Sequence, residues 1–93
     1  MLFTFELKTR QEGLHNITSE VRQAVSDSGV SEGVAVVYCP HTTGGITVNE
    51  NADPDVVRDI RTALERFFPD LPDYSHAEGN SRAHLLSSIV GPS

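Results

Sequence analysis

Residues 33–39 read Gly-Val-Ala-Val-Val-Tyr-Cys. This run is apolar at consecutive positions, so it lacks the alternation of a strand that keeps one face in water. It predicts a central strand of a sheet, buried on both faces, which Pro40 ends. The fold class expected from this stretch is α+β, with a β-sheet backed by helices.

Two shorter segments on either side of this stretch are predicted to add strands. Phe3, Phe5 and Leu7 alternate with polar residues, which is the period of a half-buried strand. Residues 46–48 resume extended structure after a Gly-Gly break. A sheet of about three strands leaves its edges open. Either partner subunits cover this sheet, or the sequence is incomplete.

Helices are predicted from apolar periodicity and from end signals. The clearest start is Asp53-Pro54, with Asp53 as N-cap and Pro54 at the first helical position, where its missing N–H costs nothing. Pro69 ends this helix. The other two helices are each bounded by a capping residue and a helix-ending glycine: Asn16 and Gly29 for the first, Asn80 or Ser81 and Gly91 for the third.

Length and charge narrow the function classes. Ninety-three residues are predicted to form a single domain, and the formal net charge is −6. Seven basic residues scattered among thirteen acidic ones argue against nucleic acid or a membrane surface as a partner. An acidic protein still binds phosphorylated metabolites when a metal ion or backbone N–H groups face the anion. Neither a signal peptide nor a membrane span is recognisable, so a cytoplasmic location is expected.

The cysteine content also limits the chemistry. Cys39 is the single cysteine, which excludes an intrachain disulfide and any multi-cysteine metal site. It lies in the apolar run, so a buried structural thiol is favoured over a catalytic one.

The first block of polar residues is His41-Thr42-Thr43-Gly44-Gly45, at the end of the predicted central strand. Strand ends commonly carry ligand sites. The two glycines let the backbone approach a ligand, successive N–H groups can form an anion-binding nest, and the threonine hydroxyls add donors. The alternative is a hydrophilic turn without a function.

The second block is Asn49-Glu50-Asn51-Ala52-Asp53. Asn and Asp favour turns and caps, and Asp53 already has a capping role. Glu50 has no such structural role. Its carboxylate can bind a metal, act as a base or orient a histidine.

The third block is His76-Ala77-Glu78-Gly79-Asn80, followed by His84. Asn80 and His84 are four residues apart, so they share a face of the third helix. Imidazole nitrogens and a carboxylate suit zinc or a related divalent ion, although the spacing matches no standard zinc signature. The alternative is a pair of ordinary surface histidines.

Taken together, the three blocks resemble the YjbQ family, also called the secondary thiamine-phosphate synthase family. The matching stretches are residues 39–43, 47–56 and 74–85, followed by Gly91-Pro92-Ser93. Members of that family continue beyond this point into further strands. The resemblance therefore implies that the C-terminal strands of the family are missing from this chain.

The resemblance further implies a trimer with sites near the subunit boundaries. It implies an enzyme, assisted by zinc or magnesium, that joins hydroxymethylpyrimidine diphosphate to thiazole phosphate and releases pyrophosphate. The alternatives are a non-catalytic metal- or metabolite-binding trimer and a structural trimer with a fossil site. The predicted roles are catalytic for Glu50, His41 and His84, substrate-binding for Thr42, Thr43, Asn49, Asn51, Asp53, Glu78, Gly79 and Asn80, and metal-binding for His41, His76 and His84.

Overall fold

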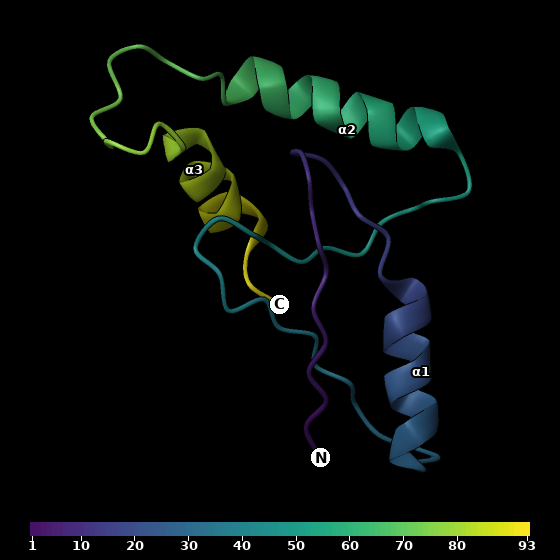
Figure 1. The fold of residues 1–93 in the computed structure, drawn as a ribbon. Coiled ribbons are helices and arrows are strands. Elements are labelled where there is room, and N and C mark those ends of the chain that lie inside the picture. The colour runs from purple at the N-terminus through teal and green to yellow at the C-terminus, as the bar shows by residue number, and fades with distance from the viewer. The chain divides into compact units, whose positions relative to one another are not determined.

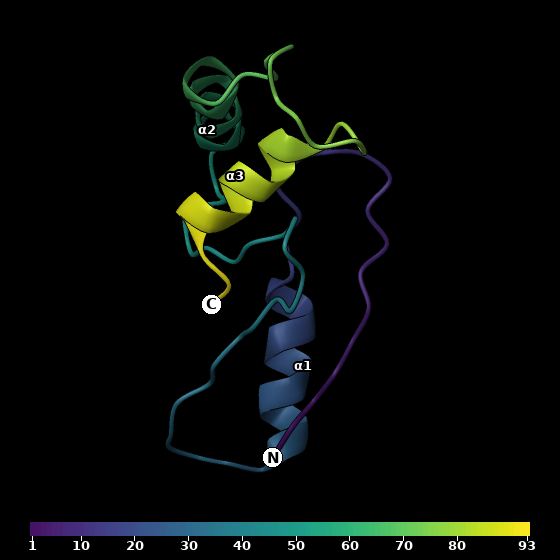
Figure 2. The ribbon, with the colours of Figure 1, turned by 90° about the vertical axis from the view of Figure 1, so that its left-hand side faces the viewer.

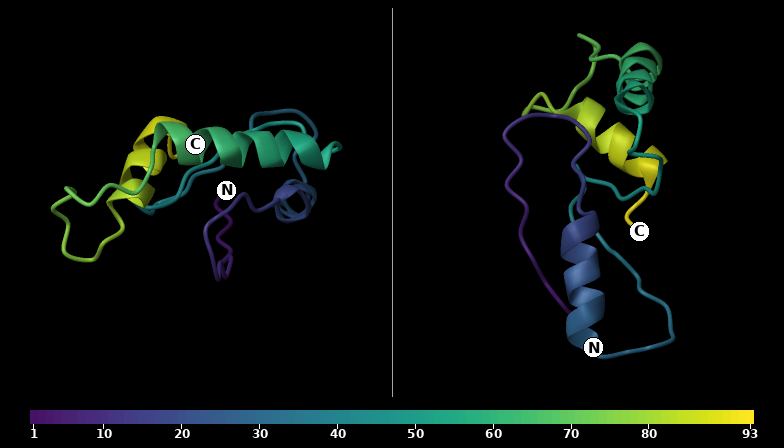
Figure 3. Two further views of the ribbon diagram at one scale, coloured as in Figure 1. Left: turned by 90° about the horizontal axis from the view of Figure 1, so that it is seen from above. Right: turned by 90° about the vertical axis from the view of Figure 1, so that its right-hand side faces the viewer.

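A computed structural model describes residues 1–93 of the chain. The chain forms two compact units, Met1–Val36 and Val37–Ser93. It contains three helices, and no strand is present in any view (Figures 1 and 3). The helices are α1 (Thr18–Ser28), α2 (Pro54–Phe67) and α3 (Ser81–Val90).

The predicted α+β fold with a β-sheet is wrong for this structure. The stretch expected to be a central buried strand leaves Val34 92% and Val36 78% exposed. A strand needs a ladder of repeated backbone bonds to a neighbour. The segments expected at residues 33–39 and 46–48 make only isolated backbone bonds, from Cys39 N to Pro92 O at 2.8 Å and from Ile46 N to Gly91 O at 2.9 Å. The apolar pattern is therefore not sufficient to form a strand, because it does not provide a neighbouring strand with which this segment could pair.

The first unit contains α1, and its ends follow the sequence signals. Asn16 accepts hydrogen bonds from the backbone N–H of Thr18 at 3.0 Å and from its hydroxyl at 2.7 Å. Gly29 ends the helix in the left-handed conformation, with φ of 69°, and donates to Ser26 O at 3.2 Å. The predicted end at Gly29 is confirmed, whereas the N-cap is Ile17, one residue after the predicted Asn16, whose side chain bonds the first helical residue instead.

The second unit begins at Val37 and includes α2 and α3. Helix α2 starts as predicted, because the Asp53 side chain accepts from Asp55 N at 2.9 Å and Pro54 is the first helical residue. Its half-buried side chains recur at helical spacing: Val56, Val57, Ile60, Leu64 and Phe68. These residues form one apolar face of the helix, whereas Phe67 is 78% exposed.

Helix α3 follows a loop after α2 and is held to the end of that helix. The Arg82 guanidinium donates to Phe68 O at 2.6 Å, so the first turn of α3 lies beside the C-terminus of α2. Figure 2 shows the segment that follows Val37 passing beside the C-terminal end of α3. None of the three helices is long and apolar enough to cross a membrane.

Candidate functional site

Two of the predicted histidines meet at the start of α3. Gly79 N donates to His76 O at 3.1 Å, which closes a turn through Ala77 and Glu78. This turn folds His76 back toward the helix. The ring centroids of His76 and His84 lie 5.2 Å apart, with their planes at 86°. The two rings therefore form an edge-to-face pair at the start of α3.

Asn80 occupies the N-cap position of α3 but does not act as a cap. Its side chain makes no capping hydrogen bond. The Oδ1 atom is closed off from solvent and has no hydrogen-bond partner. An enclosed acceptor without a donor costs about 1–3 kcal/mol. Asn80 therefore carries an enclosed, unpaired acceptor, and it lies between His76 and His84 in the sequence.

The first polar block forms a turn, which we call the His41–Gly45 turn. Gly44 N donates to His41 O at 3.3 Å, with Thr42 and Thr43 between them. A Cβ atom at Gly44 would lie 2.8 Å from Cys39 Sγ, so a larger residue there would require the thiol to move. Cys39 is half-buried beneath the turn, and its predicted structural role stays a prediction.

The His41–Gly45 turn lies on α3. The Ser87 hydroxyl donates to Gly44 O at 2.5 Å, and a Cβ atom at Gly45 would lie 2.9 Å from Val90 Cγ1. The two isolated backbone bonds, Cys39 N to Pro92 O and Ile46 N to Gly91 O, hold the chain on both sides of the turn.

A single face of α3 connects the two polar blocks. Asn80, His84 and Ser87 follow the i, i+4, i+7 spacing of one helical stripe. Because Ser87 contacts the His41–Gly45 turn, this stripe leads from the turn to the histidine pair. We call the turn, this stripe and His76 the α3 site. Ser87 was not predicted as a functional residue, although its spacing from Asn80 and His84 was visible in the sequence.

The side-chain hydrogen bonds of the second polar block stay within this block and the start of α2. Asn49 Oδ1 accepts from Glu50 N at 2.7 Å, and Asp53 caps α2. Glu50 and Asn51 are exposed. The bonds of this segment thus do not join it to the α3 site, whereas the first and third blocks are joined through α3.

The three histidines predicted as metal ligands do not form a metal site within one chain. Two imidazoles bound to one zinc at bonds of about 2.1 Å have ring centroids roughly 5 Å apart, so the spacing of His76 and His84 fits a shared ion. However, no group of three or more His, Cys, Asp or Glu side chains is placed to hold a metal. A single chain therefore does not provide enough ligands for a complete metal site.

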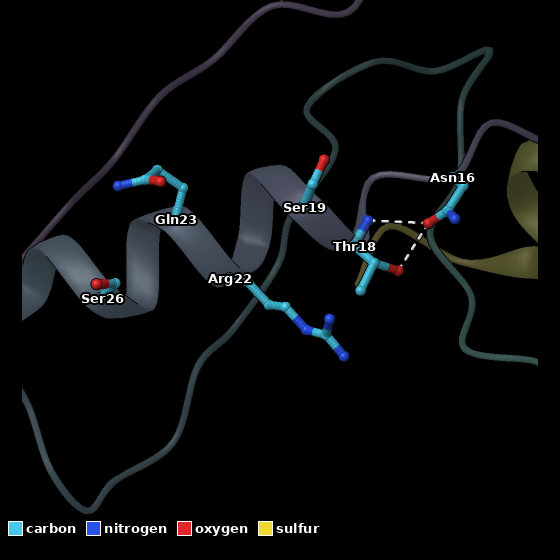
Figure 4. Close-up of a pocket in the computed structure, with 6 residues that line it drawn as sticks. All are labelled: Asn16, Thr18, Ser19, Arg22, Gln23 and Ser26. Atoms are coloured by element: carbon cyan, nitrogen blue, oxygen red, sulfur yellow. Dashed lines mark hydrogen bonds between the residues drawn. The ribbon is translucent and has the colours of Figure 1, made fainter.

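Two surface hollows are lined by residues that do not belong to the α3 site. One lies along α1, and Figure 4 shows its six polar residues, of which Asn16 and Thr18 are hydrogen-bonded to each other. The other lies along α2, between Pro54 and Glu65. No motif in the sequence marked either hollow.

Relatives of the chain cover almost all of its length. The UPF0047 protein MJ1081 of Methanocaldococcus jannaschii is 50% identical over 92 residues, which are 98% of this chain and 67% of the relative. The UPF0047 protein YugU of Bacillus subtilis is 44% identical over 95 residues, which cover 100% of this chain and 72% of the relative. The chain thus spans about two-thirds of the length of these relatives.

Solved structures agree with the course of the backbone. A YjbQ/UPF0047 family protein from Clostridium acetobutylicum matches 92% of this chain and 67% of its own, with a TM-score of 0.86 and 56% identity. The protein TT1486 from Thermus thermophilus matches 95% of this chain and 68% of its own, with a TM-score of 0.78 and 38% identity. Residues 3–93 match the sequence model of the family described as UPF0047 protein YjbQ-like, and the chain belongs to that family.

Proposed function

We propose that the α3 site binds a small phosphorylated metabolite, and that the protein is a transferase resembling secondary thiamine-phosphate synthase. The observation that supports this most directly is the docking of the His41–Gly45 turn on the helix that carries Asn80 and His84. An anion-binding type of turn and an unsatisfied polar side chain thereby belong to one structural element. In the proposed reaction, hydroxymethylpyrimidine diphosphate is joined to thiazole phosphate and pyrophosphate leaves.

The His41–Gly45 turn would hold phosphate oxygens. Thr42 and Thr43 are exposed, so their hydroxyls are free to face a ligand. The Gly44 N–H donates to His41 O within the turn, whereas the Gly45 N–H donates to no backbone carbonyl, so the Gly45 N–H is the backbone donor that would face the anion. With a net charge of −6, the protein needs such local donors to bind a diphosphate.

The remaining residues would handle protons and orient the substrate. His41 or His84 would donate a proton to the departing diphosphate, which makes the leaving group less charged. The neutral imidazole left behind would regain its proton from water, and Glu50 is the alternative group for handling protons. Orientation of the substrate is proposed for the amides, for Asp53 and for the turn before α3: Asn49, Asn51, Asn80, Asp53, Glu78 and Gly79.

A trimer is part of this proposal. The His76–His84 pair would provide two donors, and His41 of another subunit would provide the third for zinc or magnesium. Sedimentation velocity at micromolar concentration measures the assembly directly. A trimer is expected, and a well-folded monomer would remove the shared site.

The test of the reaction is pyrophosphate release. Purified protein is incubated with both proposed substrates, with and without added Mg²⁺ or Zn²⁺, and pyrophosphate is measured. Release is expected from the natural protein, with a reduction of about tenfold or more in Thr42→Val and His84→Ala. Thr62→Val, on the exposed side of α2, is the matched control and should keep the full rate. Equal rates in all four proteins would show that the release comes from another source.

A second candidate function is binding without turnover. It is favoured by the position of Glu50, because the exposed carboxylate makes no hydrogen bond or ion pair that would fix it as a base. The same purified protein distinguishes the two functions. Saturable binding of pyrophosphate with no release from the substrates would favour a binding module.

A further inference from the structure

We propose that Ser87 is a positioning residue, which fixes the direction of the Gly44–Gly45 peptide so that the Gly45 N–H faces the ligand. This inference rests on the proposed phosphate-binding role of the His41–Gly45 turn and adds a residue to it. The Ser87 hydroxyl donates to Gly44 O at 2.5 Å, across 43 residues of sequence, and both groups are half-buried.

The geometry of the peptide unit explains how Ser87 would act. The chain contains no cis peptide bond. In a trans peptide the C=O and the following N–H point in opposite directions. Because Ser87 draws the Gly44 carbonyl toward α3, the Gly45 N–H points away from Ser87. Gly45 is exposed, and its N–H donates to no backbone carbonyl, so this donor is available to an anion.

No other hydrogen bond of the turn reaches the Gly44 carbonyl, since Gly44 N donates to His41 O and Gly45 is held only by its packing against Val90. The backbone bonds from Cys39 N and Ile46 N hold the chain before and after the turn. The Gly44–Gly45 peptide lies between these two bonds. Because glycine has no Cβ atom, no steric barrier at either residue opposes a change in the orientation of this peptide. Without Ser87 the turn would stay attached to α3, but the direction of its central peptide would no longer be fixed. The expected consequence is weaker anion binding in a protein that remains folded.

Substitutions on α3 test this role with a matched control. Ser87→Ala removes the hydroxyl that reaches the turn. Ser88→Ala removes a hydroxyl whose bond, to His84 O at 3.0 Å, stays within the helix. Two quantities are measured, namely the NMR shift of the Gly45 amide without ligand and the Kd for inorganic pyrophosphate by calorimetry. Ser87→Ala should move the Gly45 amide and raise the Kd about five- to tenfold, whereas Ser88→Ala and the rescuing Ser87→Thr should stay near the natural protein.

Each outcome decides the proposal. An unchanged Gly45 amide in Ser87→Ala, an unchanged Kd, or equal effects of the two alanine substitutions would overturn it. If the natural protein does not bind pyrophosphate, the proposed function fails, and the Gly45 amide alone then decides the positioning role. If Ser87→Ala does not fold, Ser87→Cys replaces it, since a thiol of similar size is only a weak donor. A displaced Gly45 amide in that variant would support the proposal, and an unmoved one would contradict it.

Discussion

Helices α2 and α3 both begin at a residue type that caps helices, and the two residues behave differently. Asp53 accepts a hydrogen bond from Asp55 N at 2.9 Å, so it satisfies its own helix. Asn80 makes no capping bond, and its Oδ1 is enclosed without a partner. The hydrogen bonding at the start of α2 is complete within a few residues of sequence, whereas the start of α3 leaves an enclosed acceptor unpaired. The difference separates a structural polar residue from a candidate binding residue.

The largest expected effect on stability comes from a substitution where the His41–Gly45 turn packs on α3. In Gly45→Ala, the added Cβ would lie 2.9 Å from Val90 Cγ1 and 3.1 Å from Gly91 O, so the turn must move off α3. Overpacking of this kind costs about 1–3 kcal/mol. Chemical denaturation measures the loss. Gly13→Ala is the control, because a Cβ there meets nothing within 4 Å, and equal losses in both variants would contradict the packing of the turn.

The next effect concerns the cap of α2. Asp53→Ala removes the bond to Asp55 N and should lower the free energy of unfolding by about 0.5–2 kcal/mol. If Asp53 is structural, the Kd for pyrophosphate stays unchanged. Unchanged stability together with lost binding would instead place Asp53 in the substrate site.

A smaller effect on stability is expected at Asn80. Asn80→Ala removes an unsatisfied acceptor rather than a bond, so the free energy of unfolding should change by less than about 0.5 kcal/mol or rise slightly. Binding of pyrophosphate should weaken about tenfold, since the side chain is proposed to contact the ligand. A loss of stability as large as that of Asp53→Ala, with normal binding, would remove the contrast between the two helix starts.

The smallest effect is expected within the first turns of α2. Arg58 and Asp55 form an ion pair at 2.9 Å, with side chains that are 72% and 65% exposed. Such a pair contributes about 0.2–0.5 kcal/mol and is screened by salt. Arg58→Ala should therefore cost that amount at low salt and less at high salt. A larger, salt-independent loss would mean that Arg58 supports α2 in another way.

The features that the sequence predicted correctly are those with local causes. The Asp53-Pro54 start and the left-handed Gly29 depend on residues within one helical turn. The expected strands depend on distant partners, and the Gly33–Cys39 pattern does not state which segment would pair with it. The sheet was therefore wrong, while these helix boundaries were right.

The candidate site shows the same division. The pairing of His76 with His84 follows from a turn and a helix that are adjacent in sequence. The third block of polar residues therefore contained the information needed to predict it. The hydrogen bond from Ser87 to Gly44 joins residues that are 43 positions apart, so no local sequence pattern predicts it. The place of His41 among the metal ligands stays a prediction for an assembly of subunits.

The most direct test of the α3 site is an NMR titration of the natural chain with inorganic pyrophosphate, following every backbone amide. If the α3 site binds the anion, we expect saturable chemical-shift changes in the backbone amides of the His41–Gly45 turn and of residues 76–84, with little change along α1. Shifts confined to the hollow on α1, between Asn16 and Ser26, would contradict it, and so would the absence of any shift at millimolar ligand.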